Sequence, residues 1–295
     1  MDIRNIKEEA PKVGNHQLEK LYELQKELMK DYLRIEGLPD YPIEINSRKG
    51  QVVLKDMSAR VIEEMGEGYE STGYALEILD RYGFNPLSIQ DKKPDDWKMV
   101  LNHLQNSNEE QADAIAFYLE LLIYSNVGPE DIYDYVENII AKKYPISSNN
   151  FERDMQHLMD LGYILLEKRF GYENGLLDNA LYRVISSSYI GGEEYLKVHS
   201  YTPGFNNLSW EFHDTEAKLC WEVSYHLSVA RNFLKNKPWK QSGEMTDEQA
   251  YQSEIVLGFI EYLGYLKFVG MTAESAYELR FKKHMVNKFR IRSNY

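Results

Sequence analysis

The sequence has a single cysteine among its 295 residues, so Cys220 cannot form a disulfide within the chain. This fits a protein of a reducing cytosol. No apolar run approaches the roughly 20 residues of a membrane span. The opening residues, MDIRNIKEEAPK, also lack the apolar stretch of a signal peptide. We therefore expect a cytoplasmic protein that does not bind a membrane.

Basic residues are scarce relative to acidic ones. Lys and Arg number 34 against 47 Asp and Glu, which gives a formal net charge of −13. Because nucleic-acid binding needs a basic face that neutralises phosphates, this balance argues against a DNA or RNA partner. A small anionic substrate remains compatible, since a divalent cation in an acidic cluster could hold it.

Two familiar kinds of catalytic motif are also missing. The sequence contains no phosphate-binding loop of the GxxxxGKS or GxxxxGKT type. The histidines show no metal-ligand spacing, and Cys220 beside Trp221 shows no arrangement with a histidine that would mark a nucleophile. We therefore expect the histidines and Cys220 to serve in packing or surface hydrogen bonding.

Helical periodicity is what the sequence has in abundance. Apolar residues recur at spacings of three and four, and no convincing alternating strand pattern occurs, which predicts an all-α multi-helix bundle. In this pattern Asn108 can cap the helix that follows it. The expected helices cover about residues 18–28, 50–83, 95–105, 108–126, 129–144, 151–170, 213–234, 247–268 and 273–295.

The pattern also suggests a division of the chain. We expect a helical module over residues 1–150, a connecting or inserted region over 151–210, and a second helical module over 211–295. The segments NVGPEDIYDYV and FVGMTAESAYEL each follow an apolar helix, which would fit two fused helical modules. Any two helix–turn–helix units would look this similar, so that alternative stays open.

The most informative motifs are two acidic ones. EEMGE contains Glu64 and Glu67, and EEQAD contains Glu110 and Asp113. Residues three apart share a helix face, so two such helices side by side would bring four carboxylates together. Such pairs are also common on solvated helix faces. Here the residues around the first pair are small or apolar, which favours a hard oxygen site for Mg²⁺ or Mn²⁺.

The chain ends in a basic segment, YELRFKKHMVNKFRIRSNY. Lys283, Asn287 and Arg290 would share one face of a helix, where Lys and Arg can bind phosphate oxygens. The alternative is a basic segment that only touches the acidic body of the protein. Because terminal segments are often mobile, we expect this one to become ordered with a ligand.

These motifs together resemble a known family. EExxE followed by ExxD on successive helices resembles the all-α nucleoside triphosphate pyrophosphohydrolases, which include dimeric dUTPases, phage dCTP/dUTP pyrophosphatases and MazG-like enzymes. The C-terminal segment is similar to the dimeric dUTPase tail, roughly K-N-x-x-N-x-x-R-x-x-x-G-Y. The residues at its matching positions are Lys283, Asn287, Arg290 and Tyr295.

Two further motifs match the family with departures. In LYELQKELMKDY, Gln25 and Leu28 match the family pattern Q-x-x-L-N, but Met29 replaces its Asn, which bears on the choice of base. In NKPWKQ, Trp239 and Lys240 resemble the family's Trp-Lys element, although they follow the acidic motifs instead of lying between them. In the tail, the family's first Asn and its Gly are replaced by His284 and Asn294.

The resemblance implies Mg²⁺-dependent hydrolysis of a pyrimidine deoxynucleoside triphosphate to the monophosphate and pyrophosphate. It favours dUTP, with dCTP, dTTP or a modified pyrimidine as alternatives. A homodimer is implied, or a monomer if two modules are fused. The competing interpretation is a non-catalytic helical nucleotide-binding or interaction protein.

The resemblance also implies roles for individual residues. Glu64 would activate water, with Glu63 as a possible exchange partner. The implied metal ligands are Glu64, Glu67, Glu110 and Asp113. The implied substrate contacts are Gln25, Trp239, Lys240, Lys283, Asn287, Arg290 and Tyr295.

Overall fold

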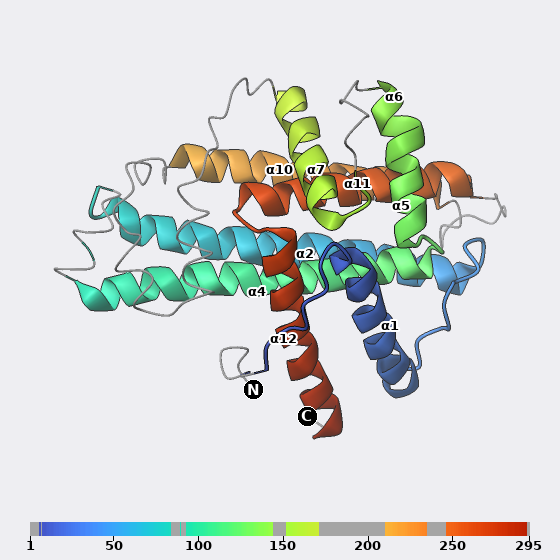
Figure 1. Cartoon of the computed structure of the whole chain (residues 1–295), viewed down its shortest axis with the longest axis horizontal. Helices are drawn as coiled ribbons and strands as arrows, with labels where there is room; N and C mark the ends of the chain where they lie inside the picture. The colour runs from blue at the N-terminus through green and yellow to red at the C-terminus, as the bar shows by residue number, and fades with distance from the viewer. Residues whose placement is uncertain are drawn as a thin grey trace.

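The computed structural model describes residues 6, 8–83, 89, 93–143, 152–170, 210–234 and 246–293. Over these ranges the chain is helical and contains no strand, so the expected all-α multi-helix bundle is confirmed (Figure 1). The helices are α1 (Gln17–Glu36), α2 (Arg48–Asp80), α4 (Pro94–Tyr124), α5 (Pro129–Tyr135), the π-helical η2 (Val136–Ile140), α6 (Ala141–Lys143), α7 (Met155–Phe170), α10 (Trp210–Phe233), α11 (Glu248–Phe268) and α12 (Ala273–Arg292).

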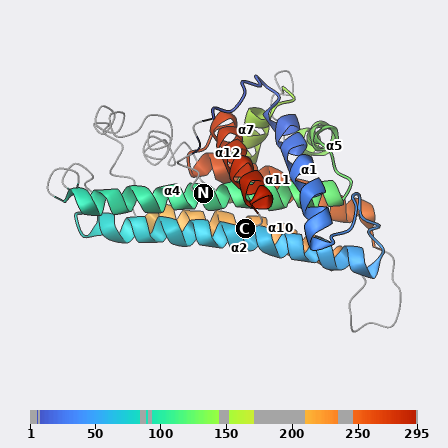
Figure 2. The same cartoon turned by 90° about the horizontal axis from the view of Figure 1, so that it is seen from below.

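The long helices α2 and α4 form an antiparallel pair that runs the length of the molecule (Figures 1 and 2). α10 packs on α2 and α11, and α7 packs on α11. Helices from both ends of the chain contribute to one hydrophobic core, in which Leu54, Tyr118, Phe259 and Leu279 are all buried. The first and last parts of the sequence are thus joined by packing and not only by the chain.

α1 and α12 lie side by side across α4, although they come from opposite ends of the chain (Figure 2). α12 begins at a capping box formed by Thr272 and Ser275 and continues to Arg292. Its residues Leu279, Phe281 and Val286 are buried. The basic segment is therefore a helix as far as Arg292 that packs on the rest of the protein. The apolar residues between its cations supply the buried face.

The helix break expected near Asn108 is wrong. α4 continues without interruption from Pro94 to Tyr124, and Asn108 is buried in its middle with no capping role. The neighbouring Ser107 hydroxyl lies 3.1 Å from the hydroxyl of Thr72 on α2. The polar residues that resemble a helix break in the sequence therefore lie in the packed part of α4, and Ser107 faces its partner helix.

α11 is buried on nearly all sides, with Ile255, Phe259, Tyr262 and Leu266 inaccessible to solvent. In the described part of the chain, no single helix is long and apolar enough to cross a membrane. Only α11 and α12 taken together reach that length and composition, and a bend of 99° separates them.

Candidate metal centre and adjoining pocket

Three carboxylates converge where α2 and α4 run side by side. Glu64 and Glu67 come from α2 and Glu110 from α4, and one oxygen of each lies within 4.8 Å of the others. Glu64 and Glu110 are partly buried, whereas Glu67 is exposed. Carboxylate oxygens are the ligands that Mg²⁺ prefers, and three of them leave room for water or phosphate oxygens in its coordination shell. The donor set therefore fits a divalent cation.

Close approach of the two helices depends on Gly68, the residue after Glu67. A Cβ at Gly68 would overlap the side-chain amide of Gln111 on α4. Gln111 is itself held from the opposite side, because its Nε2 donates to the Tyr265 hydroxyl at 3.0 Å and its backbone carbonyl accepts from Tyr262 at 2.9 Å. The glycine and this buried hydrogen-bond network set the distance between Glu67 and Glu110.

The carboxylates also influence one another's protonation. Burial, together with the charges of Asp113, Glu110 and Glu67, raises the pKa of Glu64 to about 8. Burial raises the pKa of Glu110 as well, while the charge of Lys283 opposes that shift. Without a cation, Glu64 therefore holds a proton at neutral pH. A bound divalent cation would favour its charged form.

The other two acidic residues expected at this site lie differently. The Asp113 carboxylate Oδ2 is 2.7 Å from Lys283 Nζ on α12, so it is paired with a cation of the protein. Its charge still acts on Glu64, but it does not belong to the close carboxylate group. Glu63 is exposed and also lies outside that group. The structure thus brings together three of the four expected metal ligands and places Asp113 beside them.

A pocket of about 290 Å³ is lined by residues of α1, α2, α4 and α12, and Asp113 is one of them. Asp113, Phe117 and Glu120 follow one face of α4 in this lining, to which α1 contributes Gln25 and α12 contributes Asn287. The pocket is connected to the carboxylate group through Asp113, which lies three residues from Glu110 on α4 and pairs with Lys283.

The expected substrate-binding residues are distributed unevenly around this pocket. Gln25 and Asn287 line it, and Lys283 reaches Asp113 at its end. Arg290 is exposed near the end of α12 and does not line the pocket. Three further expected contacts, Trp239, Lys240 and Tyr295, lie outside the described residues.

Gln25 is part of a buried chain of hydrogen bonds that sequence reasoning did not identify. Its Nε2 donates to Glu120 Oε1 at 2.6 Å, and its Oε1 accepts from Arg280 Nη2 at 2.5 Å. Arg280 is fully buried. One signal was available: Glu120 interrupts an otherwise apolar stretch, where a carboxylate needs a partner. Arg280 precedes Lys283 by three residues, which places both on the same side of α12.

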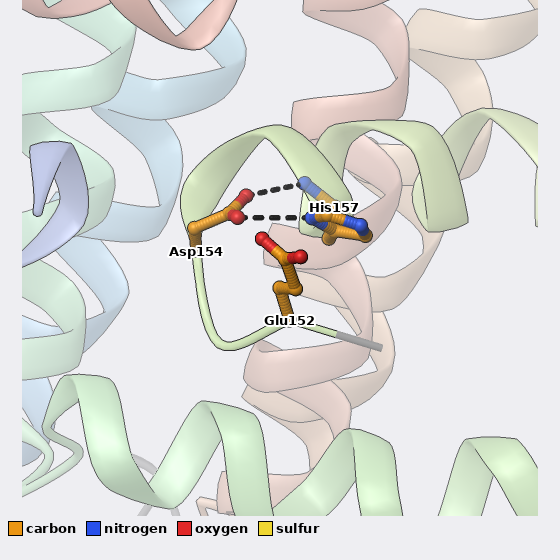
Figure 3. Close-up of side chains that lie close together, drawn as sticks. All are labelled: Glu152, Asp154 and His157. Atoms are coloured by element: carbon orange, nitrogen blue, oxygen red, sulfur yellow. Dashed lines mark hydrogen bonds and ion pairs between the residues drawn. The ribbon is translucent and has the colours of Figure 1, made fainter. Parts of the chain in front are cut away.

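Two other groups of titratable side chains are explained by local structure. Figure 3 shows Asp154 accepting from the backbone N–H of His157 at 2.8 Å and contacting its Nδ1 at 2.9 Å, which caps the start of α7, with Glu152 close by.

The second group is an ion network between α7, α10 and α11. His226 lies 3.2 Å from Glu261, and Arg169 pairs with the same carboxylate at 2.8 Å. The Arg169 guanidinium also contacts His226 itself, at 3.2 Å. An arginine thus already supplies the cation among these side chains.

Comparisons of this chain with protein families, with curated proteins and with solved structures give no match. The candidate site is therefore defined by its own geometry: three converging carboxylates, a lysine beside them, and a pocket that leads away along α4.

Proposed function

We propose that this protein is a Mg²⁺-dependent pyrophosphohydrolase that converts a pyrimidine deoxynucleoside triphosphate to the monophosphate and pyrophosphate. The observation that carries the proposal is the convergence of Glu64, Glu67 and Glu110 next to a pocket of nucleoside size. The resemblance of the acidic motifs and of the C-terminal segment to all-α nucleoside triphosphate pyrophosphohydrolases supports it.

In this proposal the carboxylate group acts on the phosphates through a bound metal ion. Glu67 and Glu110 would hold Mg²⁺ (or Mn²⁺), and the bound ion would supply positive charge against the phosphoryl oxygens. Glu64 would accept a proton from the attacking water, because it is partly buried between the other two, whereas Glu63 is exposed. Water would attack the α-phosphorus, the bond from that phosphorus to the bridging oxygen would break, and pyrophosphate would leave.

Lys283 would act as the phosphate-binding cation of the protein. It lies between the carboxylate group and the pocket and is held by Asp113. A cation there would add to the positive charge of the metal ion, because a triphosphate carries more negative charge than one divalent cation offsets. Asn287, one helical turn farther along α12, lines the pocket and would contact the sugar or the phosphate nearest to it.

The direct test is product analysis with a panel of deoxynucleoside triphosphates in Mg²⁺. We expect equal amounts of monophosphate and pyrophosphate, and loss of both in Glu67→Ala and Glu110→Gln. Glu70→Gln is the matched control, because Glu70 lies one turn from Glu67 on α2 and bonds only Tyr74 among the hydrogen bonds that are described. Release of orthophosphate and a diphosphate would contradict the proposal.

The alternative is a helical protein that binds a nucleotide without hydrolysing it. The pairing of Asp113 with Lys283 favours this alternative, since it leaves three carboxylates in the close group instead of four. The same panel separates the two: binding of a nucleotide with Mg²⁺ but no pyrophosphate over many hours would support the alternative.

A further inference from the structure

Glu216 of α10 is a fully buried carboxylate on a helix that carries none of the three converging carboxylates. Its Oε1 accepts from the Tyr265 hydroxyl at 3.2 Å and lies 3.3 Å from the Thr72 hydroxyl, and its Oε2 lies 3.2 Å from His213 Nδ1. Burial raises the pKa of Glu216, and the hydrogen bonds from these three neighbours oppose that shift. A buried carboxylate is costly without such partners, so they hold it in one place.

One branch of these hydrogen bonds leads from Glu216 to α4. The Tyr265 hydroxyl accepts from Gln111 Nε2 at 3.0 Å, so its own hydrogen is left for Glu216. The other end of the Gln111 amide, Oε1, lies 3.3 Å from the Tyr262 hydroxyl. Gln111 directly follows Glu110 in the chain. This branch therefore fixes the side chain that adjoins one carboxylate of the group.

A second branch leads from Glu216 to α2. The Thr72 hydroxyl lies 3.3 Å from Glu216 Oε1 and 3.2 Å from the backbone carbonyl of Gly68. A hydroxyl has one hydrogen, so Thr72 donates to one of these oxygens at a time while it stays in contact with the other. Gly68 directly follows Glu67. The second branch therefore ends beside another carboxylate of the group.

The two branches meet because Gly68 and Gln111 are in contact. A Cβ at Gly68 would overlap Gln111 Nε2, which is the atom that donates to Tyr265. The contacts therefore form a closed ring that runs from Glu216 through Thr72, Gly68, Gln111 and Tyr265 back to Glu216. Without the hydroxyl of Tyr265, the end of the Gln111 side chain could move away from Gly68, because glutamine has several staggered rotamers.

We propose that Glu216 is a positioning residue, which through this ring fixes the separation of Glu67 and Glu110. The inference rests on the carboxylate group of the proposed function. Each of these two carboxylates adjoins a member of the ring along the chain. α10 thus acts on metal binding without contacting the metal. A ring that only stabilised the fold would leave metal affinity unchanged when it is interrupted.

The first test asks, in the metal-free protein, whether Tyr265 holds Gln111 against Gly68. Gly68→Ala should lower the urea midpoint of the intact protein, and by less than half as much in a Tyr265→Phe background, where Gln111 is released. Tyr251→Phe is the matched control, because it removes another buried hydroxyl of α11, one that contacts Ser125. Gly68→Ala should keep its full effect there. A loss in the Tyr265→Phe background above half of that in the intact protein overturns the inference.

The second test measures Mn²⁺ affinity by calorimetry without nucleotide, well below the melting temperature of each variant. Tyr265→Phe and Glu216→Leu should each weaken binding at least fivefold. The double variant should bind no more weakly than the weaker single variant, since both changes interrupt one ring. Glu216→Gln should bind within twofold of the intact protein, because its amide can accept from Tyr265 and donate to His213. Tyr251→Phe should bind normally.

The outcomes separate this inference from the proposed function. If Mn²⁺ binds but no nucleotide is hydrolysed, the function fails and the Mn²⁺ affinities still decide the role of Glu216. If the intact protein binds no Mn²⁺, the proposed metal centre fails and the urea comparison alone decides the inference. An unchanged Mn²⁺ affinity in Tyr265→Phe overturns the positioning role, and so do losses that multiply in the double variant.

Discussion

Gly68 of α2 lies directly against the side-chain amide of Gln111 on α4, with no space for a Cβ between them. Gly68→Ala should therefore push the helices apart and destabilise the protein by about 1–3 kcal/mol, as overpacking does. It should also weaken Mn²⁺ binding, since Glu67 and Glu110 lie next to these two residues. Urea unfolding and Mn²⁺ titration measure the two effects.

Gly66→Ala is the matched control for this change. Gly66 also lies inside α2, but a Cβ there meets open space. Its replacement should stabilise the helix by about 0.5–1 kcal/mol and leave metal binding intact. Equal effects of the two substitutions would show that close approach at Gly68 does not set the geometry of the carboxylates.

The carboxylate group should bind a divalent cation in the absence of nucleotide. We expect Mg²⁺ or Mn²⁺ to raise the melting temperature, and we expect this rise to vanish in Glu110→Gln. Lys283→Ala should strengthen cation binding, because it removes a positive charge that lowers the pKa of Glu110 and pairs with Asp113. Weaker binding in Lys283→Ala would mean that Lys283 organises the site instead of competing with the cation.

Glu64 should make the metal-free protein less stable as the pH rises from about 4.5 to about 8. In the folded protein Glu64 has a pKa of about 8, raised by burial and by its acidic neighbours from its usual 4.5. Between these values the folded state holds a proton that the unfolded state has lost, so each step up in pH favours unfolding. Thermal melts across this range measure the effect.

Glu64→Gln tests the origin of that pH dependence. The variant should be more stable than the intact protein at pH 8.5 without metal, and its stability should vary less between pH 5 and 8. Added Mg²⁺ should stabilise the intact protein more at pH 8.5 than at pH 5.5. An unchanged pH profile in Glu64→Gln would assign the effect to other groups.

Lys283 and Arg290 should contribute unequally to nucleotide binding. Lys283 lies at the junction of pocket and carboxylates, whereas Arg290 is exposed beyond the pocket. Lys283→Ala should weaken triphosphate binding by about 1.5–3 kcal/mol, the usual range for a charged hydrogen bond, and Arg290→Ala by less. Inhibition or binding constants measured with a non-hydrolysable analogue give the comparison, and the opposite order would contradict the placement of α12.

Single substitutions test the role of α12 in phosphate binding better than a truncation does. Phe281 and Val286 are buried, and His284 is buried between them. Removal of everything from Lys283 onward would delete packed residues together with the phosphate-binding ones, so a loss of activity would not separate the two causes.

Local patterns were sufficient to predict the all-helical class and to place Glu64 and Glu67 on one face, because both depend on spacings of three and four residues along one helix. The approach of Glu110 to this pair depends on the packing of α4 against α2. The continuity of α4 could not be predicted in this way. Ser107 and Asn108 look like a break until Thr72 of the neighbouring helix is seen opposite them. The hydrogen bonds that join Gln25 to Glu120 and to Arg280 could not be predicted either. No local sequence pattern links residues that lie 95 and 255 positions apart.

The unbroken course of α4 has a consequence for the distance between two of its acidic residues. Glu110 and Glu120 stand ten residues apart on one rigid helix, which corresponds to about 15 Å at 1.5 Å per residue. No loop or hinge lies between the two positions, so the helix fixes the distance between their backbones. A molecule held at Glu120 must itself be long enough to reach Glu110. A ligand that contacts both residues would therefore have to span that separation, whatever its chemistry.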